Sequence, residues 1–142
     1  AWSLVATPTR LYGGFGHKPN FAQAFRLDNG TSGTSVWKFS TAGNVEKVAL
    51  TPDGLSLIAG GHFGTGQLQQ QVCTGQNLRG LMKLNAATGI LDCSWIPQLA
   101  PFGNNYNGAW DLDFTANHLW VAGGFSRINN VKAQNVARFS LT

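Results

Sequence analysis

The sequence predicts an all-β protein that contains three copies of one antiparallel sheet. Val, Ile, Phe, Trp and Thr gather in short segments, and Gly, Pro, Asn and Asp lie between these segments. Charged residues make up only 11% of the chain, and no run of Ala, Glu, Lys and Leu has helical spacing. The 142 residues have the length of one ordinary domain, which we place at 1–142.

A pair of glycines lies at the same place in each copy. The pairs are Gly13-Gly14, Gly60-Gly61 and Gly123-Gly124, and each comes at the end of a short apolar strand. Glycine weakens a strand, so its recurrence indicates a position where a side chain does not fit or where φ is positive. The inner ends of strands in sheets packed around an axis are crowded in this way. A phosphate-binding glycine loop would need a helix after it, and none is predicted.

The first copy, residues 1–44, contains four predicted strands. They are expected at 2–7, 11–15, 21–27 and 35–39. Asp28-Asn29-Gly30 is a strong turn signal between the third strand and the fourth. Asn29 also lies in an Asn-Gly-Thr pattern, which is an acceptor for N-glycosylation in a eukaryotic secretory setting.

The second copy, residues 45–108, is longer because it carries two polar, glycine-bearing loops. Its strands are expected at 45–50, 55–63, 81–84 and 92–96, and the loops at 64–77 and 97–108. The third copy, residues 109–142, has strands expected at 110–115, 119–125 and 139–141 and lacks a fourth. The third strand gives the most regular spacing, since Leu27, Leu84 and Leu141 are each 57 positions apart.

Four-stranded antiparallel units that repeat in this way are typical of a β-propeller, in which each blade buries its faces against its neighbours. Three blades do not close a ring, because the usual number is four to eight. The missing blades are therefore expected from the rest of a longer chain, from other subunits or from a partner. We favour the longer chain, and since Ala1 is not a methionine we expect a mature or excised form.

Two strings of the second copy resemble a known repeat. They are Thr51-Pro52-Asp53-Gly54 before Ala59-Gly60-Gly61-His62-Phe63, and Leu81-Met82-Lys83-Leu84-Asn85 followed by Leu91-Asp92-Cys93-Ser94-Trp95. They resemble the delta-sixty repeat of secreted bacterial β-propellers, with kelch-type propellers as the nearest rival. The resemblance implies a structural, ligand-presenting protein without a shared catalytic set. The first and third copies depart from it, with Thr7-Pro8-Thr9 and Thr115-Ala116-Asn117 in place of the turn.

The two cysteines are predicted to form a disulfide. Cys73 lies in an inserted loop and Cys93 near the following strand, twenty positions later. Two cysteines are too few for a structural zinc site and are not spaced as a redox pair, although two free thiols remain an alternative. A disulfide predicts an oxidising compartment, so we expect a secreted or cell-surface protein.

The net charge of +4 does not predict nucleic-acid binding, because the ten basic residues are scattered singly. No apolar run is long enough for a membrane helix. We therefore expect neither a nucleic-acid partner nor a membrane span. A protein or a glycan is the class of ligand that the sequence leaves open.

The polar residues give little sign of catalysis. Asp111 and Asp113 share one face of a strand and could form an acid pair, although a solvent-facing pair is the simpler interpretation. His17, His62 and His118 have no second ligand at close spacing, so a metal site would need them to meet in space. There is no Gly-x-Ser-x-Gly motif and no His beside either cysteine. We expect no enzyme activity, no cofactor and no metal.

The tryptophans are expected mainly in the core. Trp2 and Trp110 occupy equivalent first-strand positions, and Trp37 and Trp95 equivalent fourth-strand positions, which favours packing between blades. The alternative is a carbohydrate platform made by Trp120 with loop residues Asn104, Asn105 and Tyr106. The sequence thus favours a non-catalytic binding or scaffold module that recognises its ligand by blade loops. A lectin-like propeller and a fragment of a propeller hydrolase are the alternatives.

Overall fold

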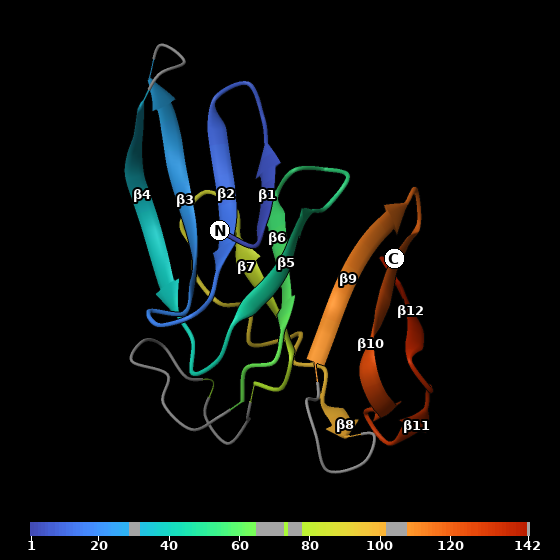
Figure 1. Cartoon of the computed structure of the whole chain (residues 1–142). Helices are drawn as coiled ribbons and strands as arrows, with labels where there is room; N and C mark the ends of the chain where they lie inside the picture. The colour runs from blue at the N-terminus through green and yellow to red at the C-terminus, as the bar shows by residue number, and fades with distance from the viewer. Residues whose placement is uncertain (29–31, 65–72, 74–77, 102–107, 142) are drawn as a thin grey trace.

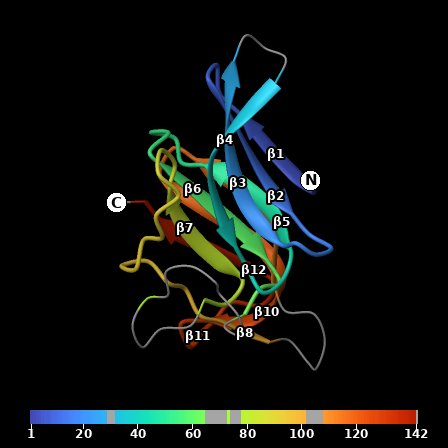
Figure 2. The ribbon, with the colours of Figure 1, turned by 90° about the vertical axis from the view of Figure 1, so that its left-hand side faces the viewer.

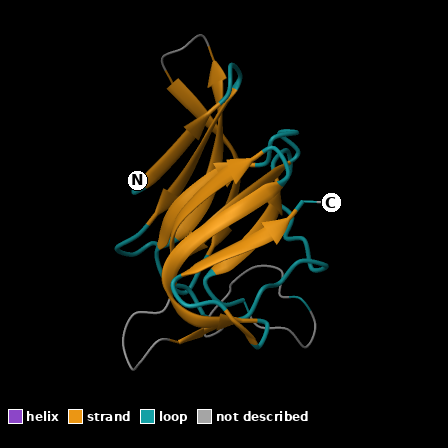
Figure 3. Cartoon of the chain, turned by 90° about the vertical axis from the view of Figure 1, so that its right-hand side faces the viewer, coloured by secondary structure: helices purple, strands orange, loops and turns teal. Residues whose placement is uncertain are grey.

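The computed structural model describes residues 1–28, 32–64, 73, 78–101 and 108–141. This described part consists of strands and connecting loops and contains no helix (Figures 1 and 3). Its strands form three sheets, and every pairing between named strands is antiparallel. The predicted all-β fold is therefore confirmed.

The first sheet is a four-stranded meander. Its strands are β1 (Ser3–Ala6), β2 (Arg10–Phe15), β3 (Phe21–Asp28) and β4 (Ser32–Ser40), in that order across the sheet. Thr7 closes the β1–β2 turn, because its hydroxyl oxygen accepts a hydrogen bond from the Arg10 N–H at 3.0 Å. The four strands expected in the first copy are confirmed. Asn29 lies outside the described residues.

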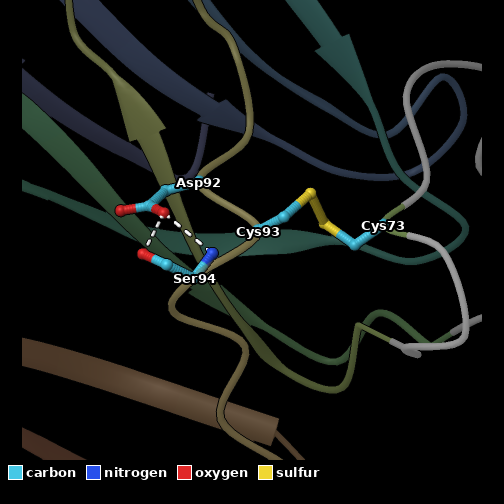
Figure 4. Close-up of a disulfide and its surroundings, with 4 residues drawn as sticks. All are labelled: Cys73, Asp92, Cys93 and Ser94. Atoms are coloured by element: carbon cyan, nitrogen blue, oxygen red, sulfur yellow. Dashed lines mark hydrogen bonds between the residues drawn. A yellow bond between two sulfur atoms is a disulfide. The ribbon is translucent and has the colours of Figure 1, made fainter.

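The middle sheet has three strands where four were predicted. They are β5 (Val45–Leu50), β6 (Ser56–Gly61) and β7 (Leu81–Asn85). The strand expected at 92–96 is wrong, since only an isolated bridge between Leu84 and Leu91 continues the sheet. The Asp92 carboxylate accepts a hydrogen bond from the Ser94 N–H at 2.9 Å and folds the chain into a turn (Figure 4).

The third sheet is arranged around the long strand β10 (His118–Ile128). The first half of β10 lies between β9 (Gly108–Thr115) and β12 (Val136–Ser140), which confirms the three strands expected in the third copy. Its last residues pair with β8 (Leu99–Pro101) and β11 (Val131–Lys132). β8 was not predicted, because its three residues lie in the segment expected as a loop.

The three sheets pack face to face in the order of the chain (Figures 1 and 2). The core consists of two clusters, one on each face of the middle sheet. On β6, Leu57 and Ala59 pack toward the first sheet, whereas Ile58 packs toward the third. The first strands lie next to one another, with β5 in contact with both β1 and β9. The middle sheet is thus buried on both faces.

The paired glycines mark places where the next sheet comes close. A Cβ added at Gly14 would lie 2.8 Å from Val45 Cγ1, and one at Gly60 would lie 3.0 Å from Ala109 Cβ. Val45 begins β5, and Ala109 lies near the start of β9. The predicted crowding is confirmed at these two glycines.

The 57-residue spacing of the third strand is not the structural repeat. The N–H of Leu27, Ala86 and Leu141 donates to the carbonyl oxygen of Thr9, Leu55 and Asn117 respectively, so these three residues are equivalent. Leu84 therefore does not match Leu27 and Leu141. The turn at Pro52-Asp53-Gly54 is two residues longer than the turns of the other copies, so equivalent residues are not evenly spaced in the sequence.

The predicted disulfide between Cys73 and Cys93 is confirmed (Figure 4), with the two Cα atoms 5.4 Å apart. It ties Cys73 to the turn that follows β7 and fits an extracellular protein. Among the described residues, no helix could span a membrane.

Candidate functional site

Of the predicted carbohydrate platform, only Trp120 belongs to the part of the chain that the structure describes. Trp120 lies on β10, on the outer face of the third sheet, and is 40% exposed. The Arg138 guanidinium lies 5.9 Å from its ring centre. Asn104, Asn105 and Tyr106 lie outside the described residues.

Asp111 and Asp113 share the outer face of the third sheet, as expected from their spacing. The Lys47 ammonium lies 2.8 Å from Asp111 Oδ1. This hydrogen bond lowers the pKa of Asp111 and outweighs burial, which raises it. Asp111 is thus held as a carboxylate, which is the wrong protonation state for a general acid near neutral pH.

Two of the three histidines line the same cavity, although they are far apart in the sequence. His17 and His62 line one cavity, whereas His118 begins β10 at the opposite end of the third sheet's hairpin. Among the described residues, no group of three His, Cys, Asp or Glu side chains could hold a metal ion.

The cavity lined by His17 and His62 is the candidate site, and we call it the Trp2–Trp110 cavity after its two tryptophans. It has a volume of about 710 Å³, within the range of small-molecule sites. Segments from all three sheets line it. They are the residue before β1, the β2–β3 and β4–β5 loops, the first residues of β5 and β9, and the residue after β6. The lining residues are Trp2, His17, Lys18, Asn20, Ala42, Gly43, Asn44, Glu46, His62 and Trp110.

Two tryptophans give the cavity its aromatic surface. Trp2 is 49% exposed and lies against His17, with ring centres 4.9 Å apart. Trp110 is 37% exposed and lies 6.0 Å from the His62 ring. The core position expected for Trp2, Trp110 and Trp120 is therefore wrong, because the first two line this cavity and the third lies on an outer face.

The remaining two tryptophans are in or near the core. Trp37 is buried between the first and middle sheets, as expected. Trp95 is half-buried against Phe139 of the third sheet, with ring centres 5.4 Å apart. It therefore packs between sheets although it belongs to no strand.

Polar groups of the cavity contact one another through short polar interactions. His62 Nδ1 lies 3.2 Å from the Glu46 carboxylate, which is largely buried. The Asn44 side-chain oxygen accepts a hydrogen bond from the His17 N–H at 3.0 Å. His17 and the next residue, Lys18, both have positive φ, so this Asn helps to hold a strained loop at the cavity edge.

The repeat explains how Trp2, Glu46 and Trp110 come together. Each comes directly before one of three equivalent residues, Ser3, Lys47 and Asp111. These three pair with Gly14, Gly60 and Ala122 at the same position of the second strand. Since the first strands are neighbours, these three side chains gather at one end of the stack. The sequence did show that Trp2 and Trp110 are equivalent, but it did not show that the position faces a cavity.

A second cavity, of about 390 Å³, lies at the other end of the β5–β6 and β9–β10 hairpins. Its walls include Ile58, Leu119 and Phe139, which belong to the packed faces of the middle and third sheets. This cavity is a gap between the sheets near Trp95. Its polar lining includes Asp53, Lys83 and Asn117, but its two aromatic rings, Trp95 and Phe139, are half-buried and pack on each other.

The lining of the Trp2–Trp110 cavity is suited to binding a ligand. Indole rings offer flat apolar faces, and the His, Asn, Lys and Glu side chains offer hydrogen-bond donors and acceptors. Among its lining residues, Glu46 is the sole carboxylate, whereas glycoside cleavage by the common mechanisms uses two.

Comparison with known proteins gives no match: no family model, no curated protein and no solved structure is similar to this chain.

Proposed function

We propose that the chain is a non-catalytic binding module of a secreted or cell-surface protein, built from propeller-type blades. The three sheets act as a rigid support, and the Trp2–Trp110 cavity binds the ligand. The observation that carries this proposal is the presence of two exposed indole rings, at equivalent positions of the repeat, on one cavity of about 710 Å³.

The chemistry of the cavity favours a carbohydrate as the ligand. A sugar ring has an apolar face that stacks on an indole and hydroxyl groups that bond to neighbouring polar side chains. Trp2 and Trp110 supply the rings, while His62, Glu46 and Asn20 supply partners for hydroxyls. The Cys73–Cys93 disulfide supports an extracellular setting, where such ligands are common.

A glycan array followed by calorimetric titration tests this proposal. The wild-type chain is expected to bind a subset of saccharides without cleaving them. Trp2→Ala and Trp110→Ala are each expected to abolish the array signal, because either change removes a stacking face.

Trp120→Ala is the matched control, since it removes an exposed tryptophan that lies outside the cavity. Its array signal is expected to equal that of the wild type. A signal that survives both cavity variants, or release of reducing sugar by the wild-type chain, contradicts the proposal.

A further inference from the structure

The three hairpins β1–β2, β5–β6 and β9–β10 have the same register. The pairs Ala6↔Leu11, Leu50↔Leu57 and Phe114↔Leu119 stand at the same place next to the turn. The residue after each of these leucines is therefore equivalent: Tyr12, Ile58 and Trp120. Tyr12 and Ile58 are buried against the following sheet. Trp120 belongs to the last of the three sheets that the structure describes, and it is exposed.

Two positions further along, the hairpins carry Gly14, Gly60 and Ala122. The first strand of the following sheet crosses close to Gly14 and to Gly60, through Val45 and Ala109 respectively. Ala122 is small and exposed at the place where a next first strand would cross. At these two positions the outer face of the third sheet matches the packed faces of the first two sheets. It differs at Asp113, which pairs with Trp120 where the first two sheets have Val5 and Ala49.

The outer face of the first sheet has the opposite character. Leu11 and Phe25 pair across β2 and β3, at the place where the middle sheet has Leu57 and Leu84. The latter two are buried because the preceding sheet covers them. On the first sheet no described sheet covers this face, and Leu4 is 58% exposed.

An aromatic cluster extends this outer face of the first sheet. The Phe15 ring stacks on Phe21 at 4.4 Å and meets Phe25 edge-on at 6.4 Å. An exposed apolar sheet face of this kind typically marks an interaction site.

We propose that the outer face of the third sheet of one copy packs on the outer face of the first sheet of a second copy, head to tail. Each chain carries both halves of the contact that already joins its own sheets, so a second copy supplies the matching surface without any other partner. Two copies bring together six sheets, within the four to eight blades that close a propeller ring. Each contact joins two different faces of the chain, and two such contacts related by a twofold axis close the ring at two copies.

Light scattering after size-exclusion chromatography tests the proposal, with a dilution series of the wild-type chain. The particle is expected to have twice the 15.2 kDa mass of one chain. Ala122→Arg blocks the third-sheet face and Leu4→Arg the first-sheet face, and each variant alone is expected to have the mass of one chain. Both residues are exposed, so each variant should keep the wild-type circular dichroism spectrum. Leu55→Arg, in the β5–β6 turn and 69% exposed, is the matched control and should keep the doubled mass.

Mixing the two variants separates a contact between two different faces from a contact between two like faces. Ala122→Arg keeps a working first-sheet face and Leu4→Arg a working third-sheet face, so the mixture is expected to regain the doubled mass. A wild-type chain that stays single at every concentration overturns the proposal. A doubled mass for either variant alone, or a mixture that stays single, also overturns it.

Discussion

Replacing Trp37 tests how the first and middle sheets are held together. The indole is 9% exposed, lies against Gly89 in the turn after β7, and donates its Nε1–H to the Ala86 carbonyl oxygen at 3.0 Å. Truncation of a large aromatic side chain in a packed core costs about 3–5 kcal/mol, so we expect Trp37→Ala to lower the free energy of unfolding by this amount.

Trp37→Phe separates the hydrogen bond from the packing. The Ala86 oxygen also accepts a hydrogen bond from Arg10 at 3.2 Å, so it keeps a partner when the indole N–H is removed. We therefore expect Trp37→Phe to lower the free energy of unfolding by only about 1–2 kcal/mol.

Urea denaturation followed by circular dichroism measures both changes. Trp2→Ala is the matched control, because Trp2 is 49% exposed, and it should lower the free energy of unfolding by less than about 1 kcal/mol. Equal losses for Trp37→Ala and Trp2→Ala would refute the packing of β4 on the middle sheet as described.

Two further predictions concern the turn at Cys93. Replacing Cys73 and Cys93 together by serine frees a loop of 20 residues, so the free energy of unfolding should fall by about 3 kcal/mol; a reducing agent should lower the urea midpoint of the wild type and leave that of the double variant unchanged. The Ser94 hydroxyl bonds to Asp92 and is the main reason for the lowered pKa of that carboxyl. Because the pKa is lowered in the folded state, the stabilisation is present above the ordinary value of 3.8 and is lost as pH falls through the lowered value. Ser94→Ala should raise the Asp92 pKa in a carboxyl NMR titration and weaken this acid dependence of the urea midpoint; an unchanged titration would contradict the assignment.

The strands of the first and third copies could be predicted because local signals agree there. Short apolar segments alternate with turns whose Thr side chains bond to the backbone, as Thr7 does to Arg10. The strand expected at 92–96 could not be excluded in this way, since its residues have suitable propensities. It fails because the Asp92 side chain bonds to Ser94, and such a local bond competes with strand pairing.

The candidate site could be predicted only in part. The equivalence of Trp2 and Trp110 follows from the sequence, and so does the crowding at the glycine pairs. The place of Glu46 does not, because it is the extra residue of a β-bulge between Val45 and Lys47. His17 and His62 meet at the cavity through loop conformations that no periodic pattern describes.

The exposure of a side chain in this chain depends on its neighbouring sheet more than on its residue type. Tyr12, Ile58 and Trp120 occupy one position of the repeat. All three side chains are largely apolar, so the residue types give no reason to expect that the tryptophan is the exposed one. The periodicity of a strand fixes which face a residue lies on, but a face is buried only where another sheet covers it. Leu4 is exposed for the same reason at the other end of the stack. The large apolar residues that remain exposed on these two end faces therefore indicate where a further sheet belongs, and Trp120 is better explained as such a packing residue than as part of a sugar site.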